Sequence, residues 1–193
     1  MQPATAKGVS TRERILIGAC EQLVKHGYEA FVLRDLAESL GMKLGNLQYY
    51  FKTRESLAFH VIEMEAAKDV EVIEGHLQAG ASAMAALESV VHDLVTRWRG
   101  STGGLFSTLA LLAMHNAAFR ELYTQIYSRF YAALKKLLHE VNPELSDEEN
   151  TIRVRIITSL IDGSAMQIQV GDIERFLERI QQQALVIAIT NPS

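Results

Sequence analysis

A run of polar and aromatic side chains over residues 43–54 carries the most informative chemistry in the chain. Asparagine and glutamine can bond to an adenine edge through two hydrogen bonds, and a leucine side chain can contact a thymine methyl group. Tyrosine hydroxyls, lysine and arginine hold phosphate groups. Placed on one helix face, these residue types suit the major groove of double-stranded DNA. The candidate DNA contacts are Arg34, Lys43, Leu44, Gly45, Asn46, Gln48, Tyr49, Tyr50, Lys52, Thr53 and Arg54.

Two short helices must position these side chains, one predicted over 33–40 and one over about 44–50, with Gly41 between them. Neither helix can bury enough surface alone, so both must pack on a third helix. That helix is predicted to start after Ser10, where Glu13 completes a capping-box spacing. This arrangement is a helix-turn-helix, whose second helix keeps one face exposed.

The rest of the chain shows helical spacing of apolar residues and no sustained alternation, which predicts an all-α fold of about nine helices. Asn142-Pro143 is predicted to end one long helix, and Ser146 to open another that runs to about Val170. The Gly100–Gly104 segment is predicted to be a turn. The predicted organisation is a flexible N-terminus (1–9), a helix-turn-helix domain (10–56) and a helical body (57–193).

Composition excludes several classes of protein. The 193 residues include one cysteine, so no disulfide can form within the chain, and the first ten residues lack the apolar segment of a signal peptide. We therefore expect a cytoplasmic protein. The net charge of -4 hides an asymmetry, because residues 1–60 carry 8 basic against 6 acidic side chains and residues 61–193 carry 11 against 17. A basic head on an acidic body is compatible with a nucleic-acid partner.

Motifs at fixed spacing along the first 60 residues resemble a known family. They are Thr11-Arg12-Glu13-Arg14-Ile15-Leu16, Gly27-Tyr28, Arg34-Asp35-Leu36-Ala37, Gly41, Gly45-Asn46-Leu47, Tyr49-Tyr50-Phe51-Lys52 and Glu55-Ser56-Leu57. Over about residues 10–60 this pattern resembles the N-terminal domain of TetR-family transcriptional repressors. The Ile161-Asp162-Gly163 segment is similar to the BetI-like subgroup. The chain departs from the family at Val32, Lys43 and Gln48, where Ser or Thr, Ser, and Tyr are usual.

The resemblance implies that the body binds a small-molecule effector and forms a homodimer on an inverted-repeat operator, from which an inducer releases it. Aromatic residues with a few polar partners are typical of such a pocket, although the same pattern also describes an ordinary core. The candidate ligand residues are Trp98, Phe106, Met114, His115, Asn116, Tyr123, Tyr127 and Met166.

The last two predicted helices are apolar on more than one face, which calls for a second cover. That cover is either a partner copy or a larger core of the same chain. The candidate dimer residues are Ile157, Ile161, Ile168, Phe176, Ile180 and Ile187.

An enzyme is the main alternative class. The chain lacks the G-x-S-x-G, Walker, H-E-x-x-H and C-x-x-C motifs, and no two of its six histidines are four residues apart. We therefore predict no enzymatic activity, no metal and no cofactor. The remaining alternative is a non-enzymatic helical protein-interaction or small-molecule-binding module with a degenerate helix-turn-helix. The exposed polar face of residues 43–54 argues against that reading.

Overall fold

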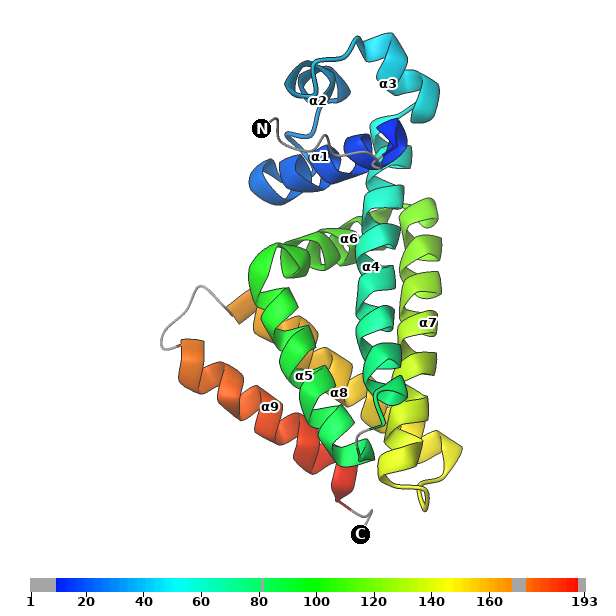
Figure 1. The fold of residues 1–193 in the computed structure, drawn as a ribbon, viewed down its shortest axis with the longest axis vertical. Helices are drawn as coiled ribbons and strands as arrows, with labels where there is room; N and C mark the ends of the chain where they lie inside the picture. Colours follow the sequence, from blue (N-terminus) through cyan, green and yellow to red (C-terminus); the bar gives the residue numbers. More distant parts are fainter. Residues whose placement is uncertain (1–9, 81, 168–172, 191–193) are drawn as a thin grey trace, which may run out of the picture. The chain divides into compact units, whose positions relative to one another are not determined.

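The computed structural model describes residues 10–80, 82–167 and 173–190. Over these residues the chain forms nine α-helices and one π-helical segment without any β-strand (Figure 1), which confirms the predicted all-α class. The elements in chain order are α1 (Thr11–His26), α2 (Leu33–Ser39), α3 (Leu44–Tyr50), α4 (Arg54–Gln78), α5 (Ala83–Arg97), the π-helical segment (Trp98–Thr102), α6 (Gly103–His115), α7 (Ala117–Val141), α8 (Asp147–Gln167) and α9 (Ile173–Ile189).

The chain divides into two compact units, of which the first ends at Glu63 and the second begins at Met64. Helix α4 begins in the first unit and ends in the second. The domain limits expected from the sequence, 10–56 and 57–193, stay a prediction. The predicted flexible N-terminus (1–9) and the predicted end of α8 at Val170 lie outside the described residues.

Helix α1 begins where the sequence predicted. Ser10 Oγ accepts a hydrogen bond from the Glu13 amide at 3.2 Å, and the Glu13 carboxylate accepts one from the Ser10 amide at 2.7 Å. These bonds complete the capping box and lower the pKa of Glu13. The helix buries Ile15, Leu16, Ala19 and Leu23 on one face, so that face is available to hold α2 and α3.

The second unit is built around α7, which packs against α5, α6 and α8, while α9 packs against α5 and α8 (Figure 1). Side-chain caps set where two of these helices begin: Asn116 Oδ1 accepts from the Ala118 amide at 2.9 Å, and Ser146 Oγ accepts from the Glu149 amide at 3.1 Å. The fully buried apolar side chains include Leu87, Val90 and Leu94 of α5, Leu109 of α6, Leu134 and Leu137 of α7, and Val154 and Ile157 of α8.

The glycine-rich segment after α5 differs from its prediction. Instead of a simple turn, Trp98–Thr102 is π-helical with a kink at Gly100, and α6 begins at Gly103. Packing is close at the start of α6, because a Cβ atom on Gly103 would lie 2.7 Å from the Ala165 Cβ and closer still to the Trp98 carbonyl oxygen. Only glycine allows α6 to approach α8 at this point.

Candidate nucleic-acid interface and ligand pocket

The turn between α2 and α3 depends on Gly41, which has a φ of 66°. The amide after it, that of Met42, donates to the Ala37 carbonyl at 2.9 Å and closes the end of α2. Helix α1 approaches α2 closely, since a Cβ on Gly18 would lie 3.0 Å from a Leu40 methyl group. Leu47 of α3 is fully buried, so its side chain fixes the inward face of α3.

The outward face of α3 is open to solvent. Tyr49 is 83% exposed and Tyr50 42% exposed, and their rings meet edge to face with centroids 5.3 Å apart. Asn46 and Gln48 are exposed beside them, and no side chain caps α3 at Lys43. A helix that presents two amides and two tyrosines to solvent beside a buried leucine has the form of a groove-reading helix.

The other predicted DNA contacts occupy different environments. Arg34, Gly45 and Lys52 are exposed, and Leu44 is partly buried. Thr53 Oγ1 accepts from the Ser56 amide at 3.1 Å, so Thr53 caps α4. All of these positions belong to the first unit.

Arg54 is already engaged within the first unit. Its guanidinium lies over the Tyr28 ring, 4.7 Å from the centroid, and its Nε donates to the Glu55 carboxylate at 3.2 Å. Burial raises the pKa of Tyr28, and a hydrogen bond from its own backbone amide contributes most to lowering the pKa of Glu55. A phosphate contact by Arg54 would therefore have to compete with these partners.

The sequence prediction missed a groove of about 420 Å³ beside α3. Its walls include Thr11 and Arg14 of α1 together with Asn46 and Tyr49. Arg14 donates to the Leu40 carbonyl at 3.5 Å, which leaves most of its guanidinium exposed. The signal was the T-R-E-R sequence at the start of α1, which places a threonine and an arginine one turn apart.

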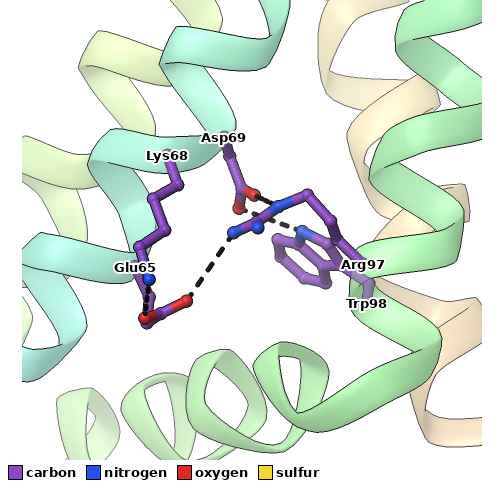
Figure 2. A network of polar contacts seen from close by, with 5 residues as sticks. All are labelled: Glu65, Lys68, Asp69, Arg97 and Trp98. Carbon is purple, nitrogen blue, oxygen red and sulfur yellow. Dashed lines mark hydrogen bonds and ion pairs between the residues drawn. The ribbon is translucent and has the colours of Figure 1, made fainter. Parts of the chain in front are cut away.

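A network of charged side chains connects α4 to α5 in the second unit (Figure 2). Asp69 is 1% exposed and accepts hydrogen bonds from Arg97 Nε at 2.7 Å and Trp98 Nε1 at 3.0 Å. Glu65 accepts from Lys68 at 2.6 Å and lies 3.7 Å from Arg97 Nη2. Burial raises the pKa of Asp69, while the Arg97 contact opposes the rise. We call these five residues the Asp69 network.

A second carboxylate lies among tyrosines between α7 and α8. The Tyr127 hydroxyl donates to Asp162 Oδ2 at 2.9 Å, whereas Asp162 Oδ1 is buried without a hydrogen-bond partner. The Tyr123 and Tyr127 rings stack with centroids 4.3 Å apart, and Tyr131 meets Tyr127 edge to face at 5.7 Å. Burial raises the pKa of Asp162 to about 7, Asp69 adds to the rise, and the Tyr127 hydrogen bond opposes it. We call these four residues the Asp162 cluster.

A small cavity is lined by Asp69 and Trp98 of the Asp69 network and by Tyr127 of the Asp162 cluster. Its volume of about 10 Å³ is the room of roughly one water molecule. Trp98 and Phe106, which stack with centroids 4.6 Å apart, form part of its wall. The lining residues are Ala66, Asp69, Trp98, Phe106, Ile126, Tyr127, Phe130 and Thr158.

The structure brings four of the eight predicted ligand residues to this region. Trp98, Phe106 and Tyr127 line the cavity, and Tyr123 stacks on Tyr127. The other four do not line it: Met114 (68% exposed), His115 and Met166 (61% exposed) face solvent, and Asn116 is occupied as the cap of α7. The predicted ligand residues did not include Asp69 or Asp162, although the Ile161-Asp162-Gly163 segment was noted as similar to the BetI-like subgroup. Asp69 follows Lys68 and lies two residues before Glu71, so its sequence surroundings resemble those of a solvent-facing acid.

The predicted dimer residues require a correction. Ile157 and Ile161 are 0% and 1% exposed because they fill the core of their own unit, so neither can contact a partner copy in this conformation. Phe176, Ile180 and Ile187 are partly buried, and Ile168 lies outside the described residues. The exposed apolar side chains of these two helices are instead Ile152, Ile156, Val186 and Ile189, together with Met166 at the end of α8.

Two kinds of site are absent from the part of the chain that the structure describes. In the described ranges, no helix is both long and apolar enough to cross a membrane. Nor do the described side chains gather three or more histidine, cysteine, aspartate or glutamate residues in a way that could hold a metal ion.

Comparison with known proteins places the helix-turn-helix among characterised sequences. Residues 15–61 match the family described as bacterial regulatory proteins, tetR family. The HTH-type transcriptional repressor AcnR of Corynebacterium glutamicum is 33% identical over 67 residues, which are 35% of this chain and 36% of that protein. AcnR of Corynebacterium diphtheriae is 34% identical over 62 residues, 32% of this chain and 33% of the relative. The match thus spans about a third of the length of these relatives.

Solved structures share the fold over nearly the whole chain. A TetR transcriptional regulator from Legionella pneumophila superimposes with a TM-score of 0.77 at 24% identity, covering 92% of this chain and 97% of the other. A TetR transcription regulator from Haloarcula marismortui gives a TM-score of 0.78 at 20% identity, covering 92% and 95%. A transcriptional regulator from Saccharomonospora viridis, solved in complex with choline, gives 0.74 at 19% identity, covering 90% and 92%.

Proposed function

We propose, from the premise that residues 15–61 belong to the tetR family of bacterial regulatory proteins, that this chain is a DNA-binding transcriptional regulator. The observation that carries the proposal is the contrast within α3, where Leu47 is fully buried and Tyr49 is 83% exposed. A large aromatic ring that a helix holds in solvent contributes little to the stability of the fold, whereas it is well placed to contact a ligand. Asn46 and Gln48 beside it supply the hydrogen bonds that read adenine.

The DNA contacts are tested by fluorescence polarisation on double-stranded DNA from upstream of the chain's own gene, over a salt series. Asn46→Ala and Tyr49→Ala should each weaken specific binding by about 1–3 kcal/mol, while circular dichroism shows an intact fold. Lys52→Ala should weaken all sequences alike and lower the salt slope by about 1. Specific binding by both of the first two variants at the parental affinity would refute the assignment.

Lys25→Ala is the matched control for charge. Lys25 is exposed in the last turn of α1, whereas Thr11 at the other end of α1 lines the groove beside Tyr49. Fourteen residues of helix separate the two ends, about 21 Å. Removing this positive charge should therefore leave both the affinity and the salt slope unchanged.

The proposed regulator acts as a homodimer on an inverted repeat. Helices α8 and α9 pack together and expose Ile152 (46%), Ile156 (44%), Val186 (48%) and Ile189 (47%). Pairing these helices with those of a second copy would remove this apolar surface from water, and two-fold symmetry would present two reading helices to one duplex. Inverted half-sites about one helical turn apart, or a multiple of that spacing, match such symmetry.

Analytical ultracentrifugation tests the dimer. A charge in the middle of the apolar surface, as in Ile156→Glu, should give a monomer at micromolar concentration. Ile17→Glu is the control, because Ile17 is similarly exposed (48%) but lies on α1 of the first unit, and this variant should stay dimeric. A parental chain that sediments as a monomer, or an Ile156→Glu variant that stays dimeric, would refute this interface.

The second unit of the proposed repressor receives a small-molecule inducer, which releases the operator. The cavity next to the Asp162 cluster is the proposed receptor, and the neighbour solved with choline supports a small organic ligand in a body of this fold. Helix α4 is the covalent connection between the units, so a ligand that favours one conformation of α4 would shift operator affinity. A thermal-shift screen of small metabolites, followed by polarisation on the operator, tests release.

A further inference from the structure

Among the described residues, no cation pairs with the carboxylate of the Asp162 cluster. Its one hydrogen bond comes from the Tyr127 hydroxyl, and its second oxygen is buried without a partner. A buried oxygen of an ionised carboxylate normally accepts at least one hydrogen bond, so an orphaned one is costly. Asp162 Oδ1 can therefore accept a hydrogen bond or an ion pair from one more group.

Asp69, which lines the cavity, is a buried carboxylate with a hydrogen-bond donor for each oxygen. Each of its two oxygens accepts a hydrogen bond, one from the Arg97 guanidinium and one from the Trp98 indole. Asp69 therefore needs no ligand, and Arg97 is committed to it. Asp162 has no such cation among the described residues, and Arg155 interacts with the Tyr131 hydroxyl.

The surroundings of Asp162 are aromatic. Tyr123, Tyr127 and Tyr131 form a continuous set of rings, with Tyr127 in contact with both of the others. Ring faces carry partial negative charge and attract an ammonium group, most strongly where water is excluded. A carboxylate and several ring faces together favour a positive, partly apolar group over an anion or a neutral sugar.

We propose that the second unit binds a small organic cation, an alkylammonium group, with Asp162 as its counter-ion and the rings of Tyr123, Tyr127 and Tyr131 as its walls. This inference rests on the proposed function in one respect, that the effector site of the regulator lies in the second unit. The existing cavity of about 10 Å³ holds no more than a water, so the head group enters by displacing tyrosine rings. Partly exposed Tyr123 and Tyr131 are the rings free to move.

The test is isothermal titration calorimetry of the full chain with tetramethylammonium chloride at constant ionic strength. We expect saturable binding of tetramethylammonium, and no binding of sodium chloride or of tert-butyl alcohol, a neutral molecule of similar size. Asp162→Asn should weaken tetramethylammonium binding at least about ten-fold, because it removes the charge and keeps the shape. Glu148→Gln, an exposed neutralisation on the same helix, should bind like the parent.

A second measurement needs no variant of the cluster. With aspartate labelled at its carboxyl carbon, the NMR titration of Asp162 in the parent chain should move to lower pH when tetramethylammonium is present, because a bound cation favours the ionised form. An unmoved Asp162 titration, absence of saturable binding, or equal affinity in Asp162→Asn would each overturn the inference. DNA binding is measured separately: a chain that binds its operator but not the cation retains the proposed function and loses only this inference. A chain that binds the cation but no DNA retains this inference and loses the proposed function.

Discussion

Replacing Asp162 by asparagine should stabilise the protein at pH 8 and leave its stability nearly unchanged near pH 4. In the folded chain, burial raises the pKa of Asp162 from 3.8 to about 7. The unfolded chain keeps the ordinary pKa, so between these two values the folded state holds a proton that the unfolded state has lost. Stability therefore falls as the pH rises through this window, and the loss is complete above about pH 7.

The size of the effect follows from the same shift. Each pKa unit corresponds to about 1.4 kcal/mol, so a rise from 3.8 to about 7 sets an upper limit of about 4 kcal/mol. Asp162 is only partly buried, and water near the exposed part reduces the penalty. Asparagine can still accept the Tyr127 hydrogen bond through its side-chain oxygen. Its amide nitrogen would then take the place of Oδ1, which has no hydrogen-bond partner, so the amide would be left without an acceptor and part of the gain would be lost. We expect a net gain of about 2 kcal/mol at pH 8.

Urea unfolding followed by circular dichroism at 222 nm, at one protein concentration and at pH 4, 6 and 8, measures this difference. Glu148→Gln is the control, because it removes a carboxylate from the exposed surface of α8 and should track the parent at every pH. If Asp162→Asn is destabilised by the same amount at pH 4 and pH 8, the carboxylate does not carry an uncompensated charge and the reasoning is wrong.

Three other substitutions test the packing and the charges of the two units by the same urea method. Gly103→Ala should cost about 1–3 kcal/mol because its Cβ would overlap neighbouring atoms, whereas Gly104→Ala, which meets nothing within 4 Å, should be neutral or slightly stabilising; equal effects would contradict the close approach. Arg97→Met should cost about 3 kcal/mol at pH 8 because it leaves the Asp69 carboxylate unpaired, and adding Asp69→Asn should recover most of that loss; no recovery would remove the charge explanation. Ser10→Ala should cost about 1 kcal/mol through loss of the α1 cap, and an unchanged stability would show that the capping box contributes nothing.

The first unit was predictable because its signals are local. Ser10 and Glu13, which form the capping box of α1, lie three residues apart. Gly41, which makes the turn, lies three residues before α3 (Leu44–Tyr50), whose bounds agree with the predicted helix over about 44–50. Caps and turns act over a few residues, so they can be read without knowledge of the tertiary fold. Helices α2 and α3 start without a side-chain cap, because the residues at their cap positions, Val32 and Lys43, have no side-chain oxygen that could accept a hydrogen bond.

The second unit was less predictable because its decisive contacts join distant residues. Helix α8 is apolar on more than one face, so the sequence could not distinguish the stripe of Ile157 and Ile161, which faces the core, from the stripe of Ile152 and Ile156, which faces solvent. The bond from Trp98 to Asp69 spans 29 residues. No periodic pattern encodes such a pair, which exists only once α4 and α5 are packed.

The chain contains one tryptophan, and it lies at the cavity wall, stacked on Phe106 and bonded to a buried carboxylate. Its emission therefore comes from a single known place in the second unit. A molecule that enters the cavity, or a shift of α4 that breaks the indole hydrogen bond, should change the wavelength or the intensity of that emission. The emission of Trp98 thus reports, without any label, whether the proposed ligand site in the second unit is occupied.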